Sequence, residues 1–151
     1  MSNDSKTFRL LILVLLLIIT FPLTTLAQTK PVTNTKTGEY FVTIQAAIDD
    51  PDTADGHIIK VNSSTYDSAN ELGGHPFGGG QALILIDKSV TIRSTGGAEQ
   101  TIIDGKSHKI VIAISEGNVT LEGFTVTGAE LPSGDNWAAG IHTSAVTEKI
   151  T

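Results

Sequence analysis

The sequence predicts an all-β fold in which very short parallel strands stack on one another in successive coils. Apolar and polar residues alternate over residues 118–128, and Gly123 separates two short strands there. Segments with the same pattern recur along the chain, two pairs of them at an equal spacing. The chain has no cysteine, so neighbouring coils rather than disulfides must supply its stability.

The spacing between matching segments is the same at two places. Residues 118–121 repeat residues 89–92, and residues 141–144 repeat residues 112–115 at an equal offset. A strand this short buries its apolar face only against a similar strand, so we expect each pair to stack in register.

A third pair, residues 101–105 and 124–128, is more closely spaced. The second copy has fewer residues before this strand. The loop 129–139 after the strand is longer by the same number, so the overall spacing is restored. Arg93 and Glu122 follow matched strands, and their separation along the chain equals that of the first two pairs. We interpret them as an exposed ion pair worth less than about 1 kcal/mol; the alternative is a charged binding patch.

The order of segments predicts three regions. Residues 1–27 read as a secretory signal, with an uncleaved membrane anchor as the alternative, because a short apolar run follows Lys6 and Arg9 and ends before a small-residue site. Residues 28–39 read as a linker, and residues 40–151 as β coils. A further strand begins at Lys149, so we expect a truncated reading frame or the first piece of a larger surface protein.

The start of the coil region predicts a capping helix. Thr43 is a suitable N-cap, Ile44, Ala47 and Ile48 would share one face, and Pro51 would end the helix. Such a helix would cover the open end of the stacked strands. The first strand is expected at 57–61, and the glycine-rich residues 70–81 are expected to be an insertion, with a groove wall as the alternative.

Several of these segments resemble the N-terminal part of a right-handed parallel β-helix of the pectin-lyase-like superfamily. The segments that carry the resemblance are 43–49, 57–61, 64–66, 101–105 and 118–124. It spans about residues 40–151 and implies a β-helix with an N-terminal capping helix. The superfamily implies polysaccharide lyases, galacturonan hydrolases, pectin esterases, surface proteins and periplasmic proteins linked to copper insertion. Ser64-Thr65-Tyr66 departs from the usual Gly-Thr-Tyr.

The charge of the chain argues against a nucleic-acid partner. The sequence has 16 acidic and 10 basic side chains, a net charge of −6. Removing residues 1–27 takes away Asp4, Lys6 and Arg9, which leaves 15 acidic and 8 basic side chains and a net charge of −7. Phosphate binding relies on clustered lysine and arginine, and the sequence has no such cluster.

Polysaccharide cleavage would need two carboxylates, or a carboxylate and a base, in one groove. The catalytic candidates are Asp104, Asp135 and His142, with Glu122 as a further carboxylate; Asp104 also suits a turn in which its side chain accepts backbone hydrogen bonds. Trp137 and Asp135 are the ligand-binding candidates, because Trp137 lies in a loop where it can stack on a sugar. No cofactor is expected, except calcium if the chain is a lyase.

Metal binding is not expected, because His57, His75, His108 and His142 show no ligand spacing. Asn62 and Asn118 match the N-glycosylation pattern Asn-X-Ser/Thr, and Asn62 is the more accessible.

The sequence therefore predicts a secreted, extracellular or cell-surface β-helix module, with the periplasm as an alternative location. It would be non-enzymatic as it stands, and either structural or a binder of a polysaccharide or cell-surface glycan. The alternative is an N-terminal fragment of a pectate lyase, galacturonan hydrolase or pectin esterase. Self-association through an open C-terminal strand edge is a further expectation.

Overall fold

A computed structural model of the protein describes residues 31–71 and 73–144. The predicted signal (1–27), the start of the predicted linker (28–30) and the strand expected at Lys149 lie outside the described residues. Within them the fold is all-β, apart from the short helix α2 (Ile44–Asp49). No helix in the described ranges is long and apolar enough to cross a membrane.

Short strands, most of three to five residues, make up the fold. In chain order they are β1 (Val32–Asn34), β2 (Tyr40–Phe41), β3 (Ile58–Val61), β4 (Ser64–Tyr66), β5 (His75–Phe77), β6 (Gly80–Ile86), β7 (Thr91–Ser94), β8 (Thr101–Asp104), β9 (Ile110–Ile114), β10 (Thr120–Glu122), β11 (Thr125–Thr127) and β12 (Ala139–Thr143). Glycines with positive φ lie in the turns after several of these strands, for example Gly123 (φ 76°) between β10 and β11.

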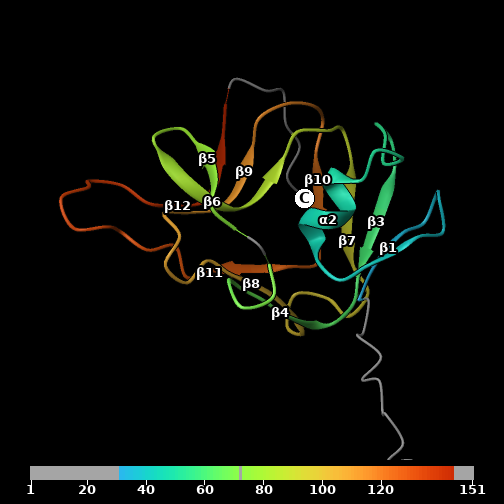
Figure 1. Cartoon of the computed structure of the whole chain (residues 1–151). Coiled ribbons are helices and arrows are strands. Elements are labelled where there is room, and N and C mark those ends of the chain that lie inside the picture. The colour runs from blue at the N-terminus through green and yellow to red at the C-terminus, as the bar shows by residue number, and fades with distance from the viewer. Residues whose placement is uncertain (1–30, 72, 145–151) are drawn as a thin grey trace, which may run out of the picture.

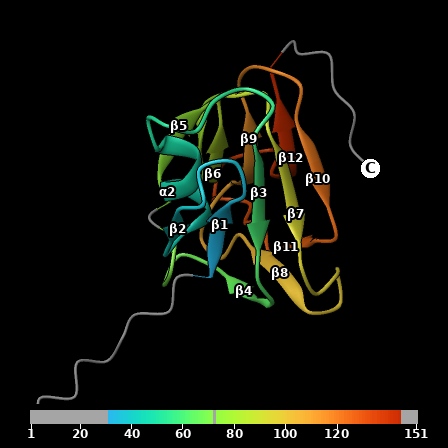
Figure 2. The same ribbon diagram turned by 90° about the vertical axis from the view of Figure 1, so that its right-hand side faces the viewer.

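The strands form three sheets, of orders β10-β7-β3-β1-β2, β11-β8-β4 and β12-β9-β6-β5. The three sheets lie on three sides of a common centre (Figure 1), and the strands of the first lie side by side in Figure 2. Pairing among β3, β7 and β10, among β4, β8 and β11, and among β6, β9 and β12 is parallel. Within each of these three sets, a strand therefore pairs with the matching strand that precedes it in the chain.

The register confirms the spacing that the sequence predicts. Leu121 lies opposite Ile92, and Ile141 opposite Ile112, so both pairs stack at the expected equal offset. Val126 lies opposite Ile103, at the shorter offset expected for that pair.

One hydrophobic core is shared by the inner faces of all three sheets. The first sheet contributes Ile59, Ile92 and Leu121 in adjacent positions, the second Tyr66 and Ile103, and the third Ile84 and Ile112. All are at most 7 % exposed. Burial of such a side chain contributes roughly 1.5–3 kcal/mol, so stacked apolar ladders rather than long strands stabilise the fold.

Helix α2 covers one end of this core, as the sequence predicts. The Thr43 side chain accepts a hydrogen bond from the Ala46 amide, and the helix ends at Asp50, before Pro51. Ile44, Ala47 and Ile48 are at most 1 % exposed and belong to the core. Figure 1 shows α2 in front of the centre that the three sheets surround.

The described part of the predicted linker is in fact structured. Within residues 31–39, β1 pairs antiparallel with β3 and with β2, so β1 and not the segment 57–61 is the first strand described. Val32 is fully buried, and the side-chain Nδ2 of Asn34 donates to Thr53 Oγ1 at 2.7 Å. The linker prediction was wrong here. Backbone pairing and one buried polar side chain hold this strand, and neither requires apolar residues at a regular spacing in the sequence.

The glycine-rich segment 70–81 also differs from a plain insertion. Its residues 75–77 form β5, which pairs antiparallel with β6 in a hairpin. The turn of this hairpin uses Gly78 and Gly79, which have positive φ. Glu71, at the start of the segment, is 3 % exposed.

Candidate functional site

The candidate site lies on the outer face of the third sheet, which the β5–β6 hairpin and the loop 128–138 cover. The register places Ala113 beside Leu85 and His142, on the face opposite the common core. Ala113 is nevertheless fully buried. It belongs to a second, smaller apolar cluster formed by Ala82, Ile110 and Ala113 with Phe77, Leu85 and Trp137.

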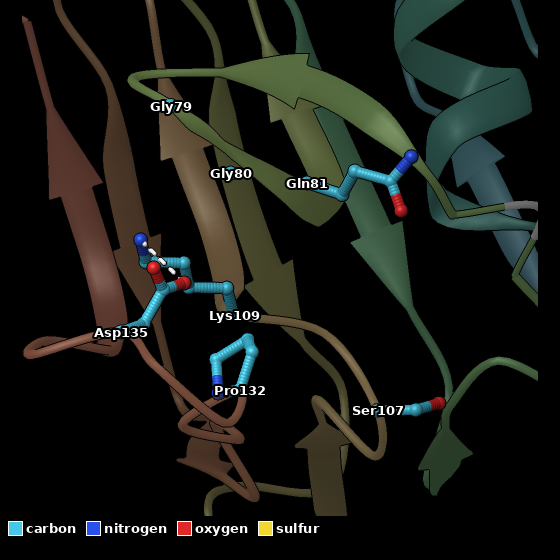
Figure 3. Close-up of a pocket in the computed structure, with 7 residues that line it drawn as sticks. All are labelled: Gly79, Gly80, Gln81, Ser107, Lys109, Pro132 and Asp135. Carbon is cyan, nitrogen blue, oxygen red and sulfur yellow. Dashed lines mark ion pairs between the residues drawn. The ribbon is translucent and has the colours of Figure 1, made fainter.

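Lys109 holds the loop 128–138 against this face. Its side chain is only 7 % exposed, and its Nζ lies 3.0 Å from Asp135 Oδ2 and 3.8 Å from the centroid of the Trp137 ring. An ion pair and a cation–π contact therefore act on one ammonium group. Figure 3 shows the Lys109 and Asp135 side chains pointing toward each other.

His142 lies between the hairpin and the loop. Its ring centroid is 5.2 Å from that of Trp137 and 5.3 Å from that of Phe77, which meets it edge-on. Its Nδ1 is buried with no hydrogen-bond partner in the described part of the chain. A side chain at Gly78 would come within 3.2 Å of this ring, so the hairpin turn packs directly on His142.

A pocket of about 230 Å³ opens beside the Lys109–Asp135 pair (Figure 3). It is lined by Gly79, Gly80 and Gln81 of the hairpin, Ser107 and Lys109 before β9, and Pro132 and Asp135 of the loop. Pockets for drug-sized ligands usually measure about 300–1,000 Å³. This one is smaller, and the carboxylate of Asp135 and the ammonium of Lys109 are the charged groups of its lining.

The structure brings three of the predicted catalytic and ligand-binding residues together and leaves two of them, Asp104 and Glu122, apart. Asp135 lines the pocket, Trp137 packs against the Lys109 that lines it, and His142 packs on Trp137. Asp104 ends β8, where its Oδ1 accepts the Lys106 amide at 3.3 Å and its Oδ2 lies 3.9 Å from Lys106 Nζ. Asp104 therefore has the turn role that the sequence analysis considered, and it does not line the pocket.

The geometry gives little support for acid–base cleavage at this pocket. Hydrolysis by paired carboxyl groups would need two of them about 5–9.5 Å apart. The lining contains one carboxylate, Asp135, which Lys109 already engages, and no histidine that could act as the base beside it. Glu122 lies on the first sheet, where its Oε2 accepts from Arg93 Nε at 2.7 Å, and both side chains are 48 % exposed. That pair confirms the predicted exposed ion pair.

The four histidines lie in separate surroundings. Asn34 contacts His57, Gly74 donates to His108 Nε2, and β5 carries His75. A group that sequence reasoning missed is Glu39, Asp50 and Asp52, whose carboxylates lie within 4.8 Å of one another. Acidic groups of this kind are common at protein surfaces, and none of the three lines the pocket.

Sequence reasoning also missed Lys109 and Phe77, which complete the site. Lys109 directly precedes the five-residue apolar strand β9, and Phe77 stands among glycines. A single lysine before a strand carries no signal of burial. The hint that was available is the length of the apolar run 110–114: a strand apolar on both faces must be covered on both faces.

Comparisons with known proteins found a significant relative. A protein described as "Cell surface glycoprotein", from Methanothermus fervidus, is 35% identical over 118 residues, which cover 78% of this chain and 17% of the relative. The chain thus spans less than a fifth of the length of that relative. No family model matches the chain, and no solved structure matches it significantly.

Proposed function

We propose that this chain is a module of an exported cell-surface protein, built from coils of a right-handed parallel β-helix, that binds carbohydrate on the outer face of its third sheet. The surface location is supported by the likeness to the cell-surface glycoprotein over most of this chain. The β-helix is supported by the parallel pairing, in each of the three sheets, of matching strands from successive parts of the chain.

The observation that carries the binding proposal is the pocket beside the pair of Lys109 and Asp135. The pair is asymmetric, because the Lys109 side chain is 7 % exposed and that of Asp135 is 41 % exposed. Asp135 therefore keeps acceptor capacity toward the pocket while Lys109 fixes its position. A sugar hydroxyl can donate to Asp135.

Trp137 would contact the carbohydrate directly. Lys109 lies over part of its ring, and the indole stays partly exposed, so a sugar ring would contact the exposed part. The same contacts make Trp137 an anchor for the loop, since the ring also packs on His142. Replacing Trp137 would therefore weaken carbohydrate binding both directly and by loosening the pocket wall.

Two measurements test the proposal. Protease treatment of intact cells that produce the full chain should degrade it while a cytoplasmic marker survives. Isothermal titration of the purified chain with cell-wall polysaccharides and their fragments should detect binding that Asp135→Ala weakens at least tenfold and Glu122→Ala leaves unchanged. Glu122 is the matched control, because it is a half-exposed carboxylate paired with a basic side chain on another sheet.

Protection of the chain in intact cells would contradict the surface role. Equal binding by the Asp135 and Glu122 variants, or no binding to any surface polysaccharide, would contradict the binding role. Turnover of polyuronides by the purified chain, with or without calcium, would instead favour the enzyme alternative.

A further inference from the structure

The connection between β3 and β4, together with the first residue of β4, presents a complete N-glycosylation tripeptide, Asn62-Ser63-Ser64. All three residues are exposed. The connection turns the chain from the first sheet to the second, at a distance from the hairpin and loop that form the pocket (Figure 1). A bulky group attached here would project from a corner of the fold and leave the pocket open.

Hydrogen bonds fix the orientation of the Asn62 side chain. Its backbone amide donates to the Pro31 carbonyl at 2.9 Å, and its own carbonyl accepts from the Tyr66 hydroxyl at 2.8 Å. The side-chain Oδ1 accepts from Thr95 Oγ1 at 3.2 Å. Because Nδ2 and Oδ1 branch from the same carbon, Nδ2 is directed away from Thr95, and it has no partner among the described residues.

The second tripeptide, Asn118-Val119-Thr120, is built differently. Val119 is 2 % exposed and belongs to the common core. Thr120 starts β10, where its amide donates to the Val90 carbonyl and the residue lies opposite Thr91. Ser64 likewise starts a strand, where it lies opposite Thr101, but it and Ser63 are exposed and no residue of the Asn62 tripeptide belongs to the core. An enzyme that must hold all three residues would therefore have to disturb the core at Asn118 and not at Asn62.

We propose that Asn62 carries an N-linked oligosaccharide and that Asn118 does not. The inference rests on the exported location proposed above. The donor is a lipid-linked oligosaccharide phosphate, and a cellular transferase catalyses the step. Asn62 Nδ2 bonds to the anomeric carbon of the sugar as the bond from that carbon to the phosphate oxygen breaks; the lipid phosphate leaves, and the proton lost from Nδ2 passes to base.

The roles of the side chains define the variants. Asn62→Gln removes the acceptor, and Ser64→Ala keeps the acceptor but removes the hydroxyl that the pattern requires. Ser64→Thr keeps that hydroxyl and is the matched control for Ser64→Ala. Asn118→Gln is the control for the second tripeptide. Thermal denaturation of each variant checks that folding is unchanged.

The experiment uses the full chain, with its own residues 1–27, in a host whose surface proteins carry N-linked glycans. Trypsin separates the two tripeptides into different peptides, residues 61–88 and 110–149. Mass spectrometry of chain released from the cell surface should show an oligosaccharide on the 61–88 peptide of the wild type, Asn118→Gln and Ser64→Thr. The mass increment should disappear in Asn62→Gln and Ser64→Ala.

Chain found at the surface with an unmodified 61–88 peptide would overturn this inference and leave the proposed function standing, as would a glycan found on Asn118 alone. Chain retained inside the cell would overturn the proposed surface function together with the glycan that depends on it. A host surface protein with a known N-glycan, recovered in the same fraction, confirms that the transferase was active.

Discussion

Glu71 accepts the backbone amide of Ile44 at 2.7 Å through Oε1, and the next amide, of Gln45, at 3.1 Å through Oε2. The carboxylate thus holds the two first amides of helix α2, while Thr43 caps the third. Glu71 is 3 % exposed, and this burial raises its pKa to about 7, although the two amides act in the opposite direction. The helix over the core is therefore attached to the segment between β4 and β5 by a titratable group.

The pH dependence of stability should reflect this group. The pKa of Glu71 rises on folding from 4.5 to about 7, so its contribution is complete below pH 4.5 and is lost as pH rises through 7. One pKa unit corresponds to 1.36 kcal/mol, so the loss is at most about 3 kcal/mol. Urea unfolding of the wild type should show a free energy of unfolding that falls between pH 5 and pH 8.

Glu71→Gln tests the assignment, because it removes the titration and keeps one acceptor for the helix amides. The fall in unfolding free energy from pH 5 to pH 8 should be smaller in Glu71→Gln than in the wild type. Glu99→Gln, which changes an exposed carboxylate, should retain the wild-type slope. Equal slopes in all three proteins would show that a group other than Glu71 causes the pH dependence.

The Lys109–Asp135 pair should matter more for stability than the Arg93–Glu122 pair. Asp135→Asn leaves a nearly buried ammonium group without its counter-ion. The expected loss is about 1–2 kcal/mol, between the values for exposed and for buried pairs. Glu122→Gln breaks a pair that is half exposed on both sides and should cost less than about 1 kcal/mol. Denaturant titrations of both variants measure the difference, and a larger loss for Glu122→Gln would contradict it.

Tryptophan fluorescence gives a second test of the Lys109–Asp135 pair, because it reports on movement of the loop. Trp137 is the sole tryptophan of the chain, so its fluorescence reports on the loop that Lys109 holds. Lys109→Met keeps an apolar stem and removes the charge, so we expect a red-shifted emission maximum and easier quenching by acrylamide. Arg93→Met, on the first sheet, should leave both unchanged. An emission spectrum unaffected by Lys109→Met would show that the loop is held by Trp137 packing alone.

A glycine fixes the position of Asp104. Gly128 has φ of +71°, and a Cβ there would overlap Asp104 Oδ1. Gly128→Ala should therefore cost more than the roughly 1–2 kcal/mol of the left-handed conformation alone. Gly134→Ala is the control, because Gly134 also has positive φ (+92°) but nothing lies within 4 Å of its missing Cβ. Adding Asp104→Ala should restore part of the stability of Gly128→Ala; no restoration would mean that the contact is unimportant.

The repeat itself could be predicted from the sequence, and the irregular parts could not. The constant spacing of matching segments predicts which residues lie opposite each other in β10 and β12, because stacked strands must match side chain for side chain. The Arg93–Glu122 pair follows from the same register. For the candidate site, the sequence also identified Asp135, Trp137 and His142, because charged and aromatic residues in a loop or facing outward stand out against an apolar repeat.

The missed features share a physical cause. Strands β1, β2 and β5 pair antiparallel at the ends of sheets, where backbone hydrogen bonds rather than an apolar period hold them. Lys109 and Glu71 are buried charges whose partners lie far away along the chain. Burial of a charge depends on such distant partners, so no local sequence pattern predicts it.

Stacking predicts an uneven cost of truncating the apolar ladder in the third sheet. Ile112 lies between Ile84 and Ile141 and is 1 % exposed, whereas Ile141 is half-buried and has Ile112 on one side. Ile112→Ala should cost about 2–5 kcal/mol, the range for a fully buried residue. Ile141→Ala should cost clearly less, because its site is already partly hydrated. Urea unfolding of the two variants measures both, and equal losses would mean that further coils or residues outside the described ranges cover Ile141 in solution.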